Sequence, residues 1–181
     1  LHVHVGSGIT DEDTWAELAD FLASLAGDFP DVQAINVGGG LGVSDRPGAA
    51  PLDVDALGAL LAETQDRHPQ YALWMEPGRY LVAEAGVLLA RVTQTKEKGP
   101  VRYVGLDTGM NSLLRPALYG AHHEIVNLTR LDEAPSTTAD VVGPICETGD
   151  VLGHNRRLPP TEPDDVLLVA TTGAYGASMS T

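Results

Sequence analysis

Three short segments of the sequence carry residues that bind anions. They are His-Val-Gly-Ser at 4–7, Gly-Gly-Gly-Leu-Gly at 38–42 and Glu-Pro-Gly-Arg at 76–79. A hydroxyl, a bare glycine backbone and a guanidinium are all groups that hold phosphate. Each segment follows an apolar run that reads as a strand, and parallel α/β sheets collect ligand sites at the carboxyl ends of their strands. The sequence therefore predicts one shared phosphate site, although a glycine run is as often a plain turn.

Glu76 and His4 extend this predicted site toward a ring. A carboxylate that follows an apolar strand is costly unless it has a partner. Beside a pyridine nitrogen, Glu76 would keep the ring protonated and make it a better electron sink. His4 would then stack on the ring face. The alternatives are a salt bridge for Glu76 and an ordinary core position for His4.

A second group of candidates lies further along the chain. Arg115 and Tyr119 are suited to a substrate carboxylate, and Glu147 to a substrate ammonium. Cys146 precedes Glu147 and is a candidate proton donor, because a thiol titrates near neutral pH. The alternative for Cys146 is a small buried apolar residue.

Composition limits the function classes. The chain has 181 residues and a net charge of −14, which disfavours nonspecific nucleic-acid binding. Its single cysteine forms no internal disulfide and fits a reducing, cytoplasmic location. No apolar run is long enough to span a membrane. No metal site is expected: His122 and His123 are adjacent on a predicted strand and point to opposite faces, and the acidic run 11–13 reads as helix N-terminal charge.

Residues 1 to about 80 alternate strands and helices, which implies parallel strands with right-handed crossovers. Strands are expected at 1–5, 34–37 and 71–75. The first helix is expected to start at a Thr10 cap with Asp13 as its capping-box partner, and the second at an Asp53 cap. The buried faces are expected to contain Trp15, Leu18, Leu22 and Leu25 in the first helix and Leu57, Leu60 and Leu61 in the second, with Leu52 and Leu57 as a hydrophobic staple.

The pattern changes near residue 84. Strands are expected at 86–93, 101–106, 123–128, 139–142 and 165–171, with a hairpin turn at 96–100. We therefore predict an α/β domain at 1–84 and a mostly β domain at 85–181. Three β/α units are too few for an eight-stranded barrel. The first part is either an open sheet or the last portion of a TIM-like barrel. The second is favoured because the chain starts within a strand, so we expect an internal fragment of a longer protein.

The sequence resembles the fold-type III PLP-dependent decarboxylases, most closely the branch that acts on diaminopimelate. The resemblance runs nearly end to end and is specific because the motifs occur together. The matching segments are His-Val-His-Val-Gly-Ser, Gly-Gly-Gly-Leu-Gly, Glu-Pro-Gly-Arg-Tyr-Leu-Val, Asp107-Thr-Gly-Met-Asn111, Arg115-Pro-Ala-Leu-Tyr119, Val142-Gly-Pro-Ile-Cys-Glu147 and Gly173-Ala-Tyr-Gly-Ala-Ser-Met-Ser180.

The resemblance implies a PLP-binding (β/α)8 TIM-like barrel followed by a β domain like the C-terminal barrel of alanine racemase. It implies pyridoxal 5'-phosphate held by His4, Ser7, Gly39, Gly40, Glu76, Gly78, Arg79 and Tyr175. Substrate would be bound by Arg79, Arg115, Tyr119 and Glu147, and catalysis would use Cys146, His4 and Glu76. The active sites would be shared across a homodimer, with the Cys-Glu segment supplied by the partner subunit.

One feature departs from the family. Its members hold PLP through a lysine on an early barrel strand, whereas the only lysines here are Lys96 and Lys98, both in the expected turn. We therefore expect the 181-residue chain alone to be inactive. For the parent protein the resemblance implies decarboxylation of meso-2,6-diaminopimelate to L-lysine. The alternatives are a decarboxylase of ornithine, arginine or a carboxylated polyamine, a non-catalytic paralogue that forms heterodimers, and a phosphate-binding barrel without PLP.

Overall fold

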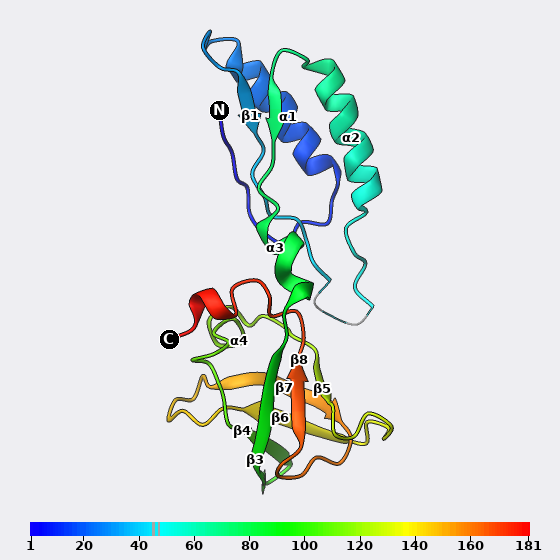
Figure 1. The fold of residues 1–181 in the computed structure, drawn as a ribbon, viewed down its shortest axis with the longest axis vertical. Helices are drawn as coiled ribbons and strands as arrows, with labels where there is room; N and C mark the ends of the chain where they lie inside the picture. The colour runs from blue at the N-terminus through cyan, green and yellow to red at the C-terminus, as the bar shows by residue number, and fades with distance from the viewer. Residues whose placement is uncertain (45, 47) are drawn as a thin grey trace. The chain divides into compact units, whose positions relative to one another are not determined.

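The computed structural model describes residues 1–44, 46 and 48–181, which divide into two compact units (Figure 1). Unit 1 contains Leu1–Ser44 and Gly48–Leu81. Unit 2 contains Val82–Thr181. The division falls between Leu81 and Val82, and the domain boundary near residue 84 stays a prediction. Each unit has its own buried core and is described by itself.

Unit 1 is built on two short parallel strands, β1 (Ala34–Asn36) and β2 (Ala72–Trp74). The helices α1 (Asp13–Ala26) and α2 (Val54–Arg67) pack against each other beside them. This is the predicted alternation of strands and helices. The core includes Trp15, Ala19, Leu22, Ile35, Val37, Leu52 and Leu57.

The chain before α1 differs from the prediction. Residues 1–5 were expected to form a strand, but only His2 makes a strand-type bridge, parallel to Asn36. The Leu1 ammonium donates to Ala34 O at 2.9 Å and the Val3 N–H to Asn36 O at 2.9 Å, so this segment still runs alongside β1. Its polar tip therefore lies at the same end of the strands as the glycine loop that follows β1.

Of the two capping predictions, one is confirmed and one is wrong. The Asp53 side chain accepts the Ala56 N–H at 2.9 Å and caps α2 as predicted. The Thr10 capping box is wrong, because α1 begins at Asp13 and no side chain caps it. Leu25 is also exposed (39%), and small residues such as Ala19 and Ala23 complete the buried face instead.

A short helix α3 (Gly78–Val82) and a 3₁₀ turn (Ala83–Ala85) follow β2. Unit 2 then forms a six-stranded mixed sheet in the order β5-β8-β3-β4-β6-β7. The outermost strands, β5 and β7, contact one another, so the sheet curls around its core. The core contains Val92, Val104, Leu106, Leu113, Val141, Leu152, Leu158, Leu167 and Val169, among others.

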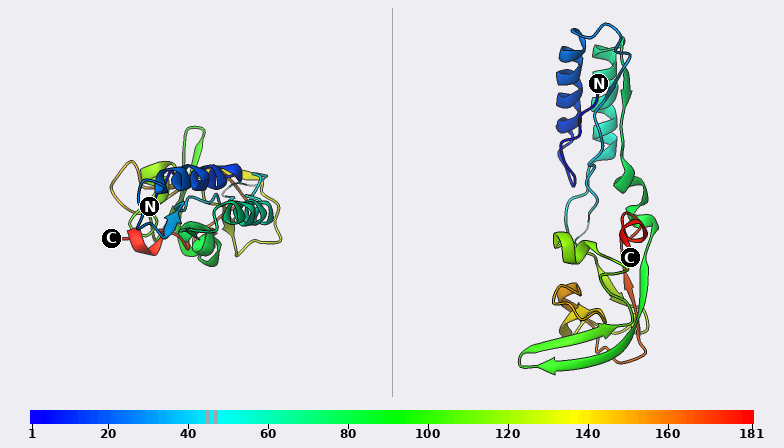
Figure 2. Two further views of the ribbon diagram at one scale, coloured as in Figure 1. Left: turned by 90° about the horizontal axis from the view of Figure 1, so that it is seen from above. Right: turned by 90° about the vertical axis from the view of Figure 1, so that its left-hand side faces the viewer.

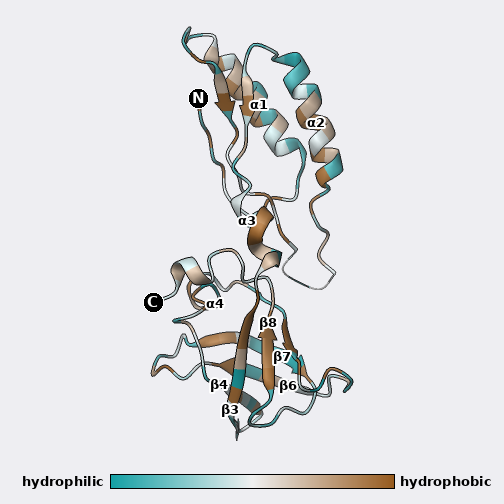
Figure 3. Ribbon diagram, viewed as in Figure 1, coloured by the Kyte–Doolittle hydropathy of each residue, from teal (hydrophilic) through white to brown (hydrophobic). Residues whose placement is uncertain are grey.

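The strands of unit 2 are β3 (Leu88–Lys98), β4 (Val101–Leu106), β5 (Ile125–Asn127), β6 (Thr137–Val142), β7 (Val151–Leu158) and β8 (Val166–Val169). β4 and β6 are parallel, and the other neighbours are antiparallel. Figure 3 shows β8 as hydrophobic along its length, in keeping with its place inside the sheet between β5 and β3.

The β3–β4 hairpin is longer than predicted. β3 continues through Lys98, which pairs with Val101, so the turn consists of Gly99 and Pro100. Gly99 has a φ of 59°, a conformation that glycine adopts without a Cβ penalty. Lys96 and Lys98 are therefore strand residues, and the turn predicted at 96–100 is wrong. Figure 2 shows this hairpin extending beyond the rest of the sheet.

Two elements of unit 2 were not predicted. β7 contains the polar run His154-Asn-Arg-Arg157, which interrupts the apolar alternation that would predict a strand. Asn155 also has a φ of 51°, at the point where the β6–β7 register shifts. The helix α4 (Arg115–Tyr119) is only five residues long. Its C-cap Gly120 adopts a left-handed conformation (φ 63°), which ends the helix after one turn.

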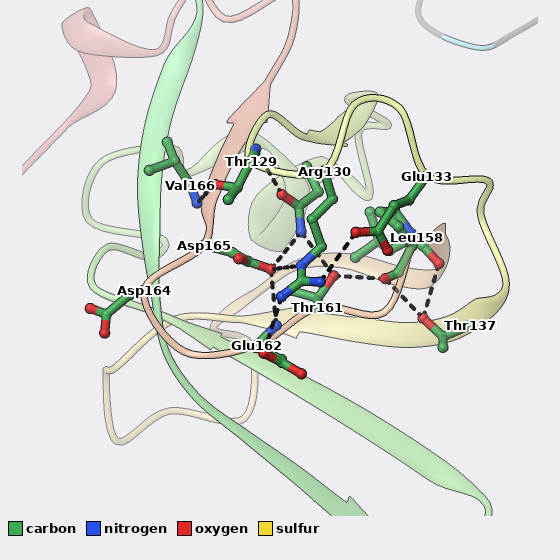
Figure 4. Close-up of polar contacts among 12 residues, drawn as sticks. Thr129, Arg130, Glu133, Thr137, Leu158, Thr161, Glu162, Asp164, Asp165 and Val166 are labelled. Carbon is green, nitrogen blue, oxygen red and sulfur yellow. Dashed lines mark hydrogen bonds and ion pairs between the residues drawn. The ribbon is translucent and has the colours of Figure 1, made fainter.

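A polar cluster closes the end of unit 2 near β5 and β8 (Figure 4). The Arg130 Nε–H donates to Asp165 Oδ2 at 2.8 Å, and Asn127 Nδ2 donates to the same oxygen at 2.9 Å. Asp165 is buried, with 4% of its surface exposed. Burial alone raises the pKa of the Asp165 carboxyl, but hydrogen bonds from Glu162 N–H, Asn127 and Arg130 together outweigh burial and lower it. No helix among the described residues is long and apolar enough to cross a membrane.

Candidate functional site

The three predicted strand-end segments of unit 1 meet through their main chains. The Gly8 and Ile9 N–H groups both donate to Gly40 O, at 2.9 and 3.0 Å. On the other side of the glycine loop, the Glu76 N–H donates to Gly38 O at 2.8 Å. The glycine loop therefore lies between the His-Val-Gly-Ser segment and the Glu-Pro-Gly-Arg segment, as the prediction of a shared site requires.

The close approach of these segments explains the glycines. A Cβ at Gly39 would overlap the carbonyl oxygen of Glu76, and one at Gly40 would overlap that of Gly6. Gly40 also has a φ of 90°, which disfavours any other residue. Trp15, which is fully buried, donates its indole N–H to Gly39 O at 3.0 Å. The loop is thus held in one conformation from three sides.

Glu76 is oriented by a side chain that was not among the predicted site residues. Asn36 Nδ2 donates to Glu76 Oε1 at 2.8 Å, while Asn36 Oδ1 accepts the Gly38 N–H at 2.9 Å. His2 Nε2 lies 3.5 Å from the other carboxylate oxygen of Glu76. Asn36 therefore ties the carboxylate to the glycine loop. The signal in the sequence that could have indicated Asn36 is its place near the end of the predicted strand that directly precedes the glycine loop.

The remaining predicted residues of unit 1 lie around the same loop. His4 Nδ1 accepts the Gly39 N–H at 3.2 Å, and His4 is exposed rather than a core histidine. Ser7 is exposed between Gly6 (φ 142°) and Gly8 (φ 80°). Gly78 and Arg79 form the first turn of α3, directly after Glu76 and Pro77, and Arg79 is half-buried.

In unit 2, α4 carries Arg115 and Tyr119 one helical turn apart, so the two side chains share a face. Tyr119 is 67% exposed. The Arg115 Nη1 donates to Nε2 of His123, at 3.1 Å. Tyr175 lies in a turn near the chain end with a φ of 65° and is 44% exposed, so its ring is accessible.

Cys146 and Glu147 lie on an exposed loop between β6 and β7. Cys146 is exposed, so the buried apolar alternative is wrong. Hydrogen bonds from the Gly149 N–H (3.3 Å) and then the Thr148 hydroxyl (3.1 Å) lower the pKa of the Glu147 carboxyl. Glu147 is therefore a carboxylate at neutral pH, suited to an ammonium ligand.

Asp150 fixes the base of this loop. It is buried (3% exposed), and its carboxylate accepts the Met110 N–H at 2.6 Å and the Ile145 N–H at 2.7 Å. Gly109 and Gly143 pack so closely on the carboxylate that a Cβ at either would overlap it. The Asp-Thr-Gly-Met segment and the Cys-Glu loop thus share one buried anchor, which was not predicted from the sequence.

Comparison with known families gives the class of protein to which the chain belongs. Residues 13–173 match the family described as "Pyridoxal-dependent decarboxylase, C-terminal sheet domain". This match covers most of unit 1 and of unit 2. The chain belongs to this family, and the mostly β unit 2 agrees with its description as a sheet domain.

The names of individual relatives are more specific than the description of the family. The chain is 38% identical over 191 residues to a diaminopimelate decarboxylase of Methanothermobacter thermautotrophicus, covering 99% of this chain and 44% of that protein. It superposes on a diaminopimelate decarboxylase of Methanocaldococcus jannaschii in complex with L-lysine, with a TM-score of 0.87, 35% identity and coverage of 99% and 43%. A structure named SrLDC, in complex with PLP and cadaverine, matches with a TM-score of 0.87, 25% identity and coverage of 99% and 48%. The chain spans less than half the length of these relatives.

Proposed function

We propose that the protein decarboxylates meso-2,6-diaminopimelate to L-lysine with pyridoxal 5'-phosphate, and that this chain supplies much of the active site. The observation that carries the proposal is the residue set of unit 2. Diaminopimelate has an ammonium and a carboxylate at both ends, and one carboxylate remains in the product. Arg115 and Tyr119 suit that carboxylate, and Glu147 suits the ammonium beside it.

The residues of unit 1 fit the cofactor. The glycine loop is a cradle that a Cβ would fill, and Ser7 and Arg79 supply a hydroxyl and a guanidinium for a phosphate. Asn36 holds the Glu76 carboxylate, which would meet the pyridine nitrogen, and His4 would stack on the ring. Gly39, Gly40, Gly78 and Tyr175 complete the predicted cofactor contacts. When bound, PLP would take up the electron pair that carbon dioxide leaves on the substrate carbon.

Cys146 returns the proton to the substrate carbon. Its thiol is exposed on a loop whose base is fixed by Asp150, so it is accessible and positioned. In the proposed homodimer this loop serves the active site of the partner subunit. Arg79 would contact both the phosphate of PLP and the substrate. The cytoplasmic location expected from the single cysteine belongs to the same proposal.

The assignment of the two units to parts of a larger protein is also proposed. In unit 1 the helix α2 connects two parallel strands, β1 and β2, as helices connect successive strands in a β/α barrel. We infer that residues 1–84 are the last part of a TIM-like barrel and 85–181 part of the C-terminal β domain. Both lysines lie in β3 of unit 2, so the lysine that holds PLP covalently belongs to sequence outside this chain.

A decarboxylase of ornithine or of other basic amino acids is the second candidate, since a lysine/ornithine decarboxylase of Vibrio vulnificus in complex with cadaverine has the same fold, with a TM-score of 0.85 and 24% identity. These substrates lack a second carboxylate and give Arg115 and Tyr119 nothing to bind. The test is to supply the full-length protein and PLP with each amino acid and measure carbon dioxide and the amine product. We expect turnover of meso-diaminopimelate to exceed that of ornithine, arginine and lysine by at least a hundredfold. Equal or greater turnover of ornithine would overturn the assignment.

A further inference from the structure

His123 is a buried polar residue that the proposed reaction does not yet use. It lies two residues before β5, with only 1% of its surface exposed. Nδ1 of the ring is 2.9 Å from Ala170 O, and Nε2 is 3.1 Å from Arg115 Nη1. Each ring nitrogen is therefore within hydrogen-bond distance of one group, and each of these groups can act only as a donor or only as an acceptor.

These two contacts determine the protonation state of the ring. A carbonyl oxygen only accepts hydrogen bonds, so Nδ1 carries the proton and donates it to Ala170. An arginine only donates, so Nε2 is the acceptor. Both bonds exist together in one state alone, the neutral imidazole with its proton on Nδ1. A doubly protonated ring would point an N–H at the guanidinium.

The backbone around His123 makes its anchor rigid. Ala170 directly follows β8, and the Ala170 N–H donates to Glu124 O at 2.8 Å, which extends the β5–β8 ladder by one step. The ring is thus fixed to the β5–β8 edge of the six-stranded sheet. Arg115 begins a helix of only one turn, which has little rigidity of its own.

We propose that His123 is a positioning residue that holds the Arg115 guanidinium for the carboxylate that remains in the product. This inference rests on the proposed function, because that function places Arg115 on a substrate carboxylate. His123 does not touch the substrate. It passes the fixed geometry of the β5–β8 edge to a side chain on a short helix. Since an arginine has several N–H donors, one can bind His123 while others face the carboxylate.

Two substitutions separate the roles of the ring nitrogens. In His123→Asn the amide reaches the Nδ1 position, keeps the bond to Ala170 and loses the acceptor for Arg115. In His123→Gln the amide oxygen reaches the Nε2 position and keeps that acceptor. Both are made in the full-length protein with PLP. L-Lysine and cadaverine are the probes, because they differ by a carboxylate; their binding is measured by calorimetry, with KM and kcat for meso-diaminopimelate measured alongside.

We expect His123→Asn to weaken L-lysine binding about tenfold, since one hydrogen bond to a charged group is lost, and to raise KM by a similar factor. Cadaverine binding and kcat should change by less than about twofold, and His123→Gln should bind L-lysine within about threefold of wild type. Equal weakening of L-lysine and cadaverine, or equal behaviour of the two variants, would overturn the inference.

The outcome does not depend on the variants folding. Nitrogen NMR of wild-type His123 reports its tautomer directly, and an Nε2–H or doubly protonated ring at pH 7.5 contradicts the inference. The proposed function fails separately, if wild type releases no carbon dioxide from meso-diaminopimelate. In that case the binding measurements still test the role of His123. Binding that depends on the ligand carboxylate and on an acceptor at position 123 supports this role, and binding that depends on neither rejects it.

Discussion

Single side chains at the strand ends are oriented by specific hydrogen bonds. Glu76 is more than half exposed, yet its Oε1 is held at 2.8 Å by Asn36, whose own carbonyl is fixed by the Gly38 N–H. A solvent-exposed carboxylate would sample several rotamers without such a partner. The arrangement favours a carboxylate that must meet one ring atom in one direction, as the proposed PLP site requires.

The Glu76→Gln substitution tests this role. The amide keeps an oxygen for Asn36 but loses the charge that keeps a pyridine nitrogen protonated. We expect the full-length variant to bind PLP and to lose about a hundredfold in kcat, the size of effect seen when one proton-handling group is removed. Glu63→Gln, an exposed carboxylate on α2 of the same unit, is the control and should leave kcat unchanged. An unaffected Glu76→Gln enzyme would reject the assignment.

Among the structural elements, the glycine loop between β1 and α2 shows most clearly how backbone packing makes the site. Gly39→Ala places a Cβ on the Glu76 carbonyl, which the surrounding main-chain hydrogen bonds do not allow to move. We expect unit 1 to lose about 2 kcal/mol and PLP affinity to fall at least tenfold. Thermal unfolding and a PLP absorbance titration measure the two effects.

The same substitution elsewhere in unit 1 should have the opposite sign. Gly58 is inside α2, and a Cβ there meets no atom within 4 Å. Gly58→Ala should therefore stabilise the protein by about 0.5–1 kcal/mol, because alanine is the better helix former. If both variants lose stability, the close approach at Gly39 is not the cause of its effect.

The Cys-Glu loop depends on Asp150 in a similar way. Asp150→Asn conserves volume but turns one acceptor into a donor that faces the N–H of Met110 or Ile145. An unpaired buried N–H costs about 1–3 kcal/mol, so the melting temperature should fall. Cys146 and Glu147 lose their fixed base, and kcat should fall at least tenfold. The exposed Asp132→Asn variant controls for the change in charge. A wild-type kcat in Asp150→Asn would show that the loop needs no such anchor.

The elements also show what the sequence alone could predict. The Asp53 cap and the strands around the glycine loop follow from local rules, because their signals lie within a few residues. β7 was missed because its polar residues satisfy partners elsewhere in the fold, such as His154 with Asp140 at 2.9 Å. His123 and Asp150 were missed as site residues for the same reason. Their partners are 8 to 47 and 5 to 40 positions away, and pairing at that range is decided by tertiary structure.

At the scale of the whole molecule, charge governs stability against acid. The chain carries 25 acidic and 11 basic residues, so a buried carboxylate needs a specific partner. Asp165 has one in Arg130, which also bonds Glu133 and Glu162 at 3.3 and 3.1 Å (Figure 4). The cluster joins the β5 end, the loop that follows it and the start of β8, so it stabilises much of unit 2.

This cluster predicts a defined pH dependence. The folded-state pKa of Asp165 is lowered by Glu162 N–H, Asn127 and Arg130 in excess of the burial effect. The stability it contributes is present above the unfolded pKa, about 3.9, and is lost as pH falls through the lower folded value. Asp165→Asn should cost about 2 kcal/mol at pH 7, and the difference from wild type should shrink below about pH 4. Calorimetric unfolding from pH 7 to pH 3 measures both.

The neighbouring Asp164 provides the control. Its side chain is 88% exposed and lies 3.9 Å from Arg91, a surface pair that contributes little. Asp164 also has a φ of 72°, which asparagine tolerates as well as aspartate does. Asp164→Asn should therefore follow the wild-type curve at every pH. If Asp165→Asn keeps a constant deficit down to pH 3, the loss comes from packing, and the charge of Asp165 is not what stabilises unit 2.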